Sequence, residues 1–162
     1  MRRLALVLAV FWLTLALSGC GFQLRGSYQL PADLERVAIN APQFSEFAEQ
    51  ARQRFTLAGA ELVEQGDVVR IDILGDRLSR RTLSLSASGQ VAEYELIYTV
   101  DYRLIKRNGA TRNLQVEVFR DYQDDPNFAL AKTRERELLV AEMREQAAQR
   151  MLRQVIAQLA EN

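Results

Sequence analysis

The sequence predicts a single α+β domain, with two helices packed on one face of a four-stranded mixed sheet in the order β-α-β-β-β-α. Three observations support this fold class. Apolar residues recur with helical spacing between residues 42 and 58, strict alternation runs from 94 to 104, and a second helical pattern fills the segment from 133 to 160. A β-α-β start favours a parallel strand pair joined by a right-handed crossover, and the later strands are joined by hairpins.

The first predicted strand is the short apolar run 37–40, and the first helix follows it. Pro42 suits the first turn of a helix, and Gly59 is placed to end it as the residue after the C-cap. The apolar positions of this helix lie on one face, so we expect its three phenylalanines to be core residues. The predicted face consists of Phe44, Phe47, Ala48, Ala51, Phe55 and Ala58.

The period changes to two after Gly66, which predicts strands. Residues 69–73 alternate, and the pattern returns near 83–85. A turn is expected at Ser88-Gly89-Gln90, before the long alternating strand 94–104. Asn108-Gly109 is a strong hairpin signal, and the last strand follows at 114–118.

The last predicted helix, residues 133–160, carries an apolar stripe wide enough to cover a sheet. That stripe consists of Leu138, Leu139, Met143, Ala147, Met151, Leu152, Val155, Ile156 and Leu159. Its other face mixes glutamate and arginine, as a solvated surface does. Before this helix stand Asp124 and Asp125. Two carboxylates without a third ligand nearby favour a turn or cap over a metal site.

Composition excludes much enzyme chemistry. The chain has 162 residues, 21 basic and 21 acidic side chains, no histidine and one cysteine. Histidine-based triads, histidine metal sites, internal disulfides and cysteine-cluster metal sites are therefore impossible. Zero net charge gives no reason to expect nucleic acid as a partner.

The N-terminus predicts a lipoprotein signal peptide over residues 1–19. Arg2 and Arg3 precede an uncharged run, 4–17, which is too short to span a bilayer comfortably but suits a signal peptide. Leu17-Ser18-Gly19-Cys20 resembles the bacterial lipobox, in which the cysteine thiol is acylated. Residues 20–162 would then form one lipid-anchored domain. Gly21 is not the Asp that resembles an inner-membrane retention signal, which favours the outer membrane.

Basic residues supply the candidate binding sites. Arg77, Arg80 and Arg81 cluster near the second predicted strand, beside the interruption at Gly75. They either discourage edge-to-edge strand pairing or form a docking patch for a phosphorylated glycolipid. Lys132 stands just before the predicted last helix, where the helix dipole disfavours positive charge, so it is a second candidate.

The sequence also resembles the LPS-assembly lipoproteins of the LptE (RlpB) family. The similar stretches are CGFQLRG at 20–26, QVAEY at 90–94, VFR at 118–120, DPNFALAK at 125–132 and EM at 142–143. The resemblance implies the two-helix, four-strand fold, no enzymatic activity and no cofactor beyond the covalent lipid on Cys20. It also implies lipopolysaccharide binding at Lys132. A second basic position of some relatives falls near Ala87, which is uncharged here.

For partners, the resemblance implies a one-to-one complex with the LptD outer-membrane β-barrel, whose assembly the protein assists. The domain would be a plug inside the barrel lumen, facing the periplasm, and would help deliver lipopolysaccharide to the outer leaflet. A stand-alone outer-membrane lipoprotein that binds or carries lipid without an obligate barrel is the alternative. An enzyme acting on envelope material is a third hypothesis, for which the chain offers only the adjacent carboxylates Asp124 and Asp125.

Overall fold

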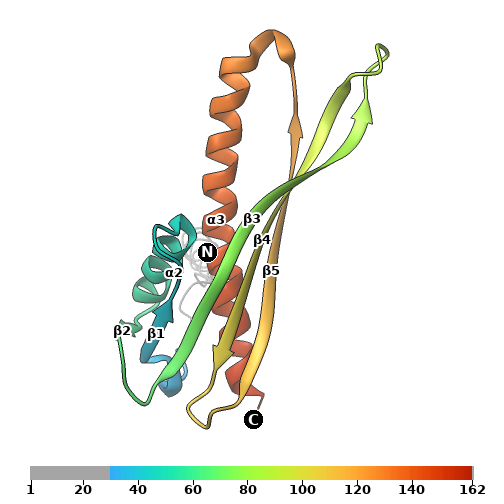
Figure 1. Ribbon diagram of the computed structural model, residues 1–162. Helices are drawn as coiled ribbons and strands as arrows, with labels where there is room; N and C mark the ends of the chain where they lie inside the picture. Colours follow the sequence, from blue (N-terminus) through green and yellow to red (C-terminus); the bar gives the residue numbers. More distant parts are fainter. Residues whose placement is uncertain (1–29, 162) are drawn as a thin grey trace, which may run out of the picture.

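The computed structural model of the chain describes residues 30–161 and contains one mixed sheet flanked by two helices (Figure 1). The sheet has five strands in the order β2-β1-β3-β4-β5, so the prediction of four strands is wrong by one. The additional strand, β2, covers Glu61–Leu62 and pairs in parallel with β1. Two exposed residues are too few for an alternating pattern, which is why periodicity does not reveal this strand.

The β-α-β unit at the N-terminal end of the described chain is as predicted. A short 3-10 helix, η1 (Ala32–Leu34), leads into β1 (Arg36–Asn40), and α2 (Glu46–Leu57) connects it towards β3 (Val69–Leu85). Strands β1 and β3 pair in parallel over four residue pairs. Gly59 has a φ of 101°, the left-handed conformation that suits glycine after a helix C-cap.

Helix α2 begins at Glu46 rather than at Pro42, and the prediction that Phe44 is a core residue is therefore wrong. Ser45 is its N-cap, and the Ser45 Oγ accepts a hydrogen bond of 3.1 Å from the Ala48 N–H. Phe44 therefore lies outside the helix, with a φ of 61° and 98% of its surface exposed. Phe47 and Phe55 are fully buried, as predicted. The serine cap, rather than the proline, determines where this helix starts.

Three long antiparallel strands form the other part of the sheet: β3, β4 (Val91–Ile105) and β5 (Thr111–Gln123). Irregular pairing at Ile73/Gly75 bends β3 without ending it. Gly89 and Gly109, in the two predicted turns, both have positive φ values. The β3–β4 hairpin extends past the helix-covered part of the sheet, and its tip curves away from α3 (Figure 1).

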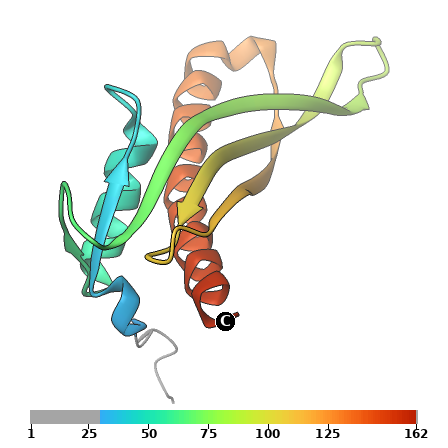
Figure 2. The same ribbon diagram turned by 60° about the horizontal axis from the view of Figure 1, so that its bottom comes forward.

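The long helix α3 (Ala129–Ala160) starts four residues before the predicted boundary, after the short 3-10 helix η2 (Pro126–Phe128). Both helices lie on the same side of the sheet, as predicted, and the other sheet face stays open (Figure 2). Between the layers lie fully buried side chains from both, each of which stabilises the fold by about 1.5–3 kcal/mol. They include Phe47, Phe55, Tyr98, Tyr102, Met143 and Met151. Leu138, expected in the stripe, is instead 68% exposed.

Candidate functional site

The three candidate arginines of β3 lie on two different faces of the sheet, because side chains alternate along a strand. Arg80 is paired in register with Leu96, whose side chain is buried on the helix-covered side. Arg77 and Arg81 are separated from Arg80 by an odd number of positions, so their side chains lie on the opposite, open face. The sequence cluster is thus not a single patch in space.

On the open face, Arg77 and Arg81 are ion-paired with carboxylates of β4. The Arg77 guanidinium lies 2.5 Å from Asp101, and that of Arg81 lies 2.7 Å from Glu95. A hydrogen bond from Gln115, together with Arg77, holds the pKa of Asp101 below its ordinary range. Exposed pairs of this kind are worth at most about 1 kcal/mol each. The open face is therefore a surface of mixed and locally compensated charge.

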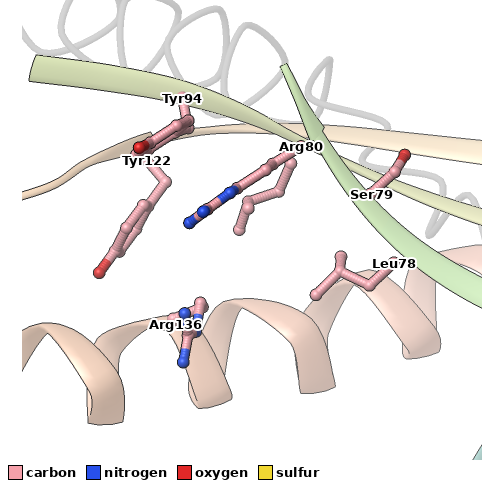
Figure 3. A pocket seen from close by; sticks show the side chains of 7 residues that line it. Leu78, Ser79, Arg80, Tyr94, Tyr122 and Arg136 are labelled. Carbon is pink, nitrogen blue, oxygen red and sulfur yellow. The ribbon is translucent and has the colours of Figure 1, made fainter. Parts of the chain in front are cut away.

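On the helix-covered side, Arg80 stacks over the ring of Tyr94, with its guanidinium carbon 4.6 Å from the ring centre. This pair forms part of the wall of an open cavity of about 470 Å³ between the sheet and α3 (Figure 3). The size is typical of ligand pockets, which range from about 300 to 1,000 Å³. The cavity is lined by Leu78, Ser79, Arg80, Tyr94, Leu96, Tyr122 and Arg136.

Helix α3 supplies the opposite wall through Arg136, and β5 supplies Tyr122. The Tyr122 hydroxyl donates a hydrogen bond of 3.0 Å to the backbone carbonyl oxygen of Lys132. Burial, reinforced by the negative charge of Asp124, raises the pKa of Tyr122 above its ordinary value. In Figure 3 the Arg80 guanidinium extends towards the Tyr122 ring, with Arg136 on the helix across from it.

Lys132 borders this region without lining the cavity itself. Its ammonium nitrogen lies 5.4 Å from the centre of the Tyr122 ring and 2.8 Å from a Glu135 carboxylate oxygen. The hydrogen bond with Glu135 raises the pKa of Lys132, so its charge is fixed but already paired. We define the basic cavity as the lined space described above, and Lys132 as its neighbour across Tyr122.

The structure therefore places Arg80 on Tyr94 inside the cavity and Lys132 beside Tyr122, which forms another part of the cavity wall. Arg77 and Arg81 lie on the opposite face of the sheet. Sequence reasoning missed Arg136. A signal for it was present, since Arg136 follows Lys132 by four residues and residues four apart share a helix face. Ala87 is exposed in the β3–β4 turn and adds no charge there. Cys20 and the predicted signal peptide lie outside the described residues.

The adjacent carboxylates Asp124 and Asp125 have a structural role at the end of β5. Asp125 Oδ1 accepts a hydrogen bond of 2.9 Å from the Asn127 N–H at the start of η2. Within residues 30–161, no group of three potential metal ligands comes together. In the same part of the chain, neither long helix contains a stretch apolar enough to cross a bilayer.

Known proteins resemble this chain in both sequence and fold. The family model LptE, described as lipopolysaccharide-assembly, matches residues 34–155. An LPS-assembly lipoprotein LptE of Yersinia pestis (strain Pestoides F) is 35% identical over 160 residues, covering 96% of this chain and 77% of the relative.

Two solved structures are also similar. The crystal structure of rare lipoprotein B from Shewanella oneidensis gives a TM-score of 0.72 and 38% identity, over 77% of this chain and 96% of that one. The solution structure of an uncharacterized lipoprotein B from Nitrosomonas europaea gives 0.70 and 32%, over 87% and 94%.

Fold and sequence together define the class: small α+β domains of envelope lipoproteins from Gram-negative bacteria. Within that class, the chain belongs to the LptE family of lipopolysaccharide-assembly lipoproteins. The family is non-enzymatic and uses no cofactor. The resemblance read from the sequence motifs is thereby confirmed.

Proposed function

We propose that this protein is an outer-membrane lipoprotein that plugs the LptD β-barrel, assists its assembly and helps deliver lipopolysaccharide to the outer leaflet. The observation that carries the proposal is the match to LPS-assembly lipoproteins along 96% of the chain. A likeness confined to the fold would not justify it, because one fold serves many functions. Here the likeness extends through the sequence of the whole domain.

The anchor in this proposal is Cys20. Residues 1–19 act as the signal peptide, and residues 20–162 form the mature, acylated single domain. One acyl chain holds a protein only marginally, whereas two or more hold it stably, so the fully acylated cysteine keeps the domain at the membrane. Tethering raises the effective concentration of the domain next to a barrel in the same membrane. With Gly21 following the cysteine, we assign the outer membrane.

The open sheet face supports the plug arrangement. The lumen of a large β-barrel is polar, so a guest needs a charged surface of both signs rather than an apolar patch. The pairs Arg77–Asp101 and Arg81–Glu95 give the open face this character. In a one-to-one complex, the domain would sit in the lumen and face the periplasm.

Lipopolysaccharide binding at Lys132 is the second part of the proposal. Its test is Lys132→Asp, with Lys106→Asp at the β4–β5 hairpin as the matched control. Aspartate is favourable in the first turns of a helix, so α3 should keep its stability. We expect weaker binding of lipopolysaccharide by Lys132→Asp and a nearly unchanged melting temperature, since the exposed pair with Glu135 that is lost is weak. Unchanged binding would show that this lysine takes no part.

The decisive experiment for the barrel partner is extraction of outer membranes in mild detergent from cells that express the tagged full chain. We expect one large β-barrel protein to co-purify at one-to-one stoichiometry. Recovery of the acylated lipoprotein alone would favour the alternative, a stand-alone lipid-binding lipoprotein without an obligate barrel. The observation that favours this second candidate is the basic cavity beside α3, which has the size of a ligand pocket.

A further inference from the structure

The basic cavity is lined by two guanidinium groups, those of Arg80 and Arg136. Within residues 30–161, neither Arg80 nor Arg136 forms an ion pair with a carboxylate, whereas Arg77, Arg81 and Lys132 each do. Arg136 also borders a smaller hollow with Glu46 and Glu137, and no ion pair is formed there either. Two guanidinium groups that line one cavity repel each other unless an anion lies between them.

The two arginines approach from opposite walls, which suits a bridging anion. Arg80 comes from β3 and is held in place by stacking on Tyr94, and Arg136 comes from α3. Guanidinium groups bind phosphate oxygens with two parallel hydrogen bonds, and stacking limits the side-chain entropy lost on binding. A phosphate group in the cavity could therefore accept hydrogen bonds from Arg80 of the sheet and from Arg136 of the helix.

The remaining cavity residues point to an amphiphile rather than to a free ion. Leu78 is 43% exposed and lines the cavity together with the buried Leu96. An exposed leucine next to two cations fits a ligand that joins a phosphate to apolar groups. The rings of Tyr94 and Tyr122 offer flat apolar surfaces with the breadth of a sugar ring.

From these observations we propose that the basic cavity binds a phosphomonoester on the sugar head group of a glycolipid, with Arg80 and Arg136 as the phosphate ligands. The inference rests on the proposed function, because it names the part of lipopolysaccharide that this chain recognises. Lys132, already paired with Glu135, has a supporting position across Tyr122.

The test compares arginines on the two faces of β3. The variants are Arg80→Gln and Arg136→Gln, with Arg77→Gln and Arg81→Gln as matched controls on the open face. The acylated full chain is titrated in one nonionic detergent with three probes: bisphosphorylated lipid A, the same lipid A after enzymatic removal of its phosphates, and glucosamine 1-phosphate. Thermal unfolding of each variant checks that its fold is intact, as expected for exposed side chains.

We expect Arg80→Gln and Arg136→Gln each to weaken binding of bisphosphorylated lipid A at least about tenfold, since each removes hydrogen bonds to a charged group. The two controls should stay within about twofold. For lipid A without phosphates, all five proteins should bind alike and weakly.

Three results would overturn the inference, each in a different way. Normal binding by both cavity variants would show that the phosphates are held elsewhere, while lipopolysaccharide binding itself stands. Equal affinity for glucosamine 1-phosphate and lipid A would contradict the lipid part of the assignment. No binding of lipid A by the unmodified protein would contradict the proposed lipopolysaccharide role, and with it the inference.

Discussion

The Tyr122 hydroxyl donates a hydrogen bond of 3.0 Å to the backbone carbonyl oxygen of Lys132. The two residues stand ten positions apart, at the end of β5 and in the first turn of α3. The bond ties the last strand to the start of the long helix across the reversal at η2. It also fixes the orientation of a tyrosine ring that forms one wall of the basic cavity.

Loss of this hydrogen bond should loosen the connection between β5 and α3. Tyr122→Phe keeps the ring and removes the hydroxyl, so we expect the free energy of unfolding to fall by about 0.5–1.5 kcal/mol. Tyr94→Phe is the matched control, because the described residues give the Tyr94 hydroxyl no hydrogen-bond partner. Urea unfolding of both variants measures the difference. Equal effects of the two substitutions would contradict a structural role for the Tyr122 hydroxyl.

The phenylalanines on either side of the Ser45 cap should respond in opposite ways. Phe47 is fully buried, so Phe47→Ala should cost about 3–5 kcal/mol of unfolding free energy. Phe44 is exposed and has a φ of 61°. Phe44→Gly should raise stability by about 0.5–1 kcal/mol, since relief of a strain of about 1–2 kcal/mol exceeds the entropy cost of glycine. Chemical denaturation measures the unfolding free energy of both variants. A loss of stability in Phe44→Gly would mean that this side chain makes stabilising contacts of its own.

Acid should weaken the fold partly through Asp101. Its pKa in the folded protein is held below the ordinary value of 3.8 by Gln115 and Arg77. The carboxylate therefore stabilises the folded state above about pH 4, and this contribution is lost as the pH falls below that value. Asp101→Asn should be less stable than the unmodified protein at pH 7, by less than about 1 kcal/mol because the group is exposed. Urea unfolding at pH 7 and pH 3 should show that gap closing, and a gap that is constant with pH would contradict this assignment.

Removal of the proposed acylation site should separate anchoring from folding. Cys20→Ala takes away the thiol that we propose to carry the lipid, so we expect the domain to leave the membrane fraction while keeping its fold. Fractionation after a high-salt wash, with circular dichroism of the released protein, measures both. If a strain without the barrel protein still retains the variant fully in its membranes, lipid anchoring at Cys20 is wrong.

Sequence periodicity predicted most of this fold because long elements repeat their pattern many times. The alternation around Tyr98 and the helical stripe around Met143 each extend over several turns or residue pairs, and both proved buried. Short features carry no such repetition. Strand β2, with two exposed residues, has no period to detect, and the start of α2 depends on the side chain of Ser45.

The candidate site was predicted less well, since its members come together only in the folded chain. Arg77, Arg80 and Arg81 are neighbours in sequence, yet alternation sends Arg80 to one face and the other two to the opposite face. Arg136 is distant from them in sequence and reaches the cavity through the packing of α3 on the sheet. Spacing within one element was predictable, whereas contact between elements was not.

The crossover that joins β1 to β3 has a consequence for the order in which the domain folds. Strands β3, β4 and β5 and helix α3 follow one another along the chain and are joined by short turns, so their contacts close small loops and form readily. Strand β1 pairs with β3 over only four residue pairs. We therefore expect the β1–α2–β2 segment to dock late and to open first, with its amide protons exchanging before those of β4. Equal protection in both segments would instead make the domain a single cooperative unit.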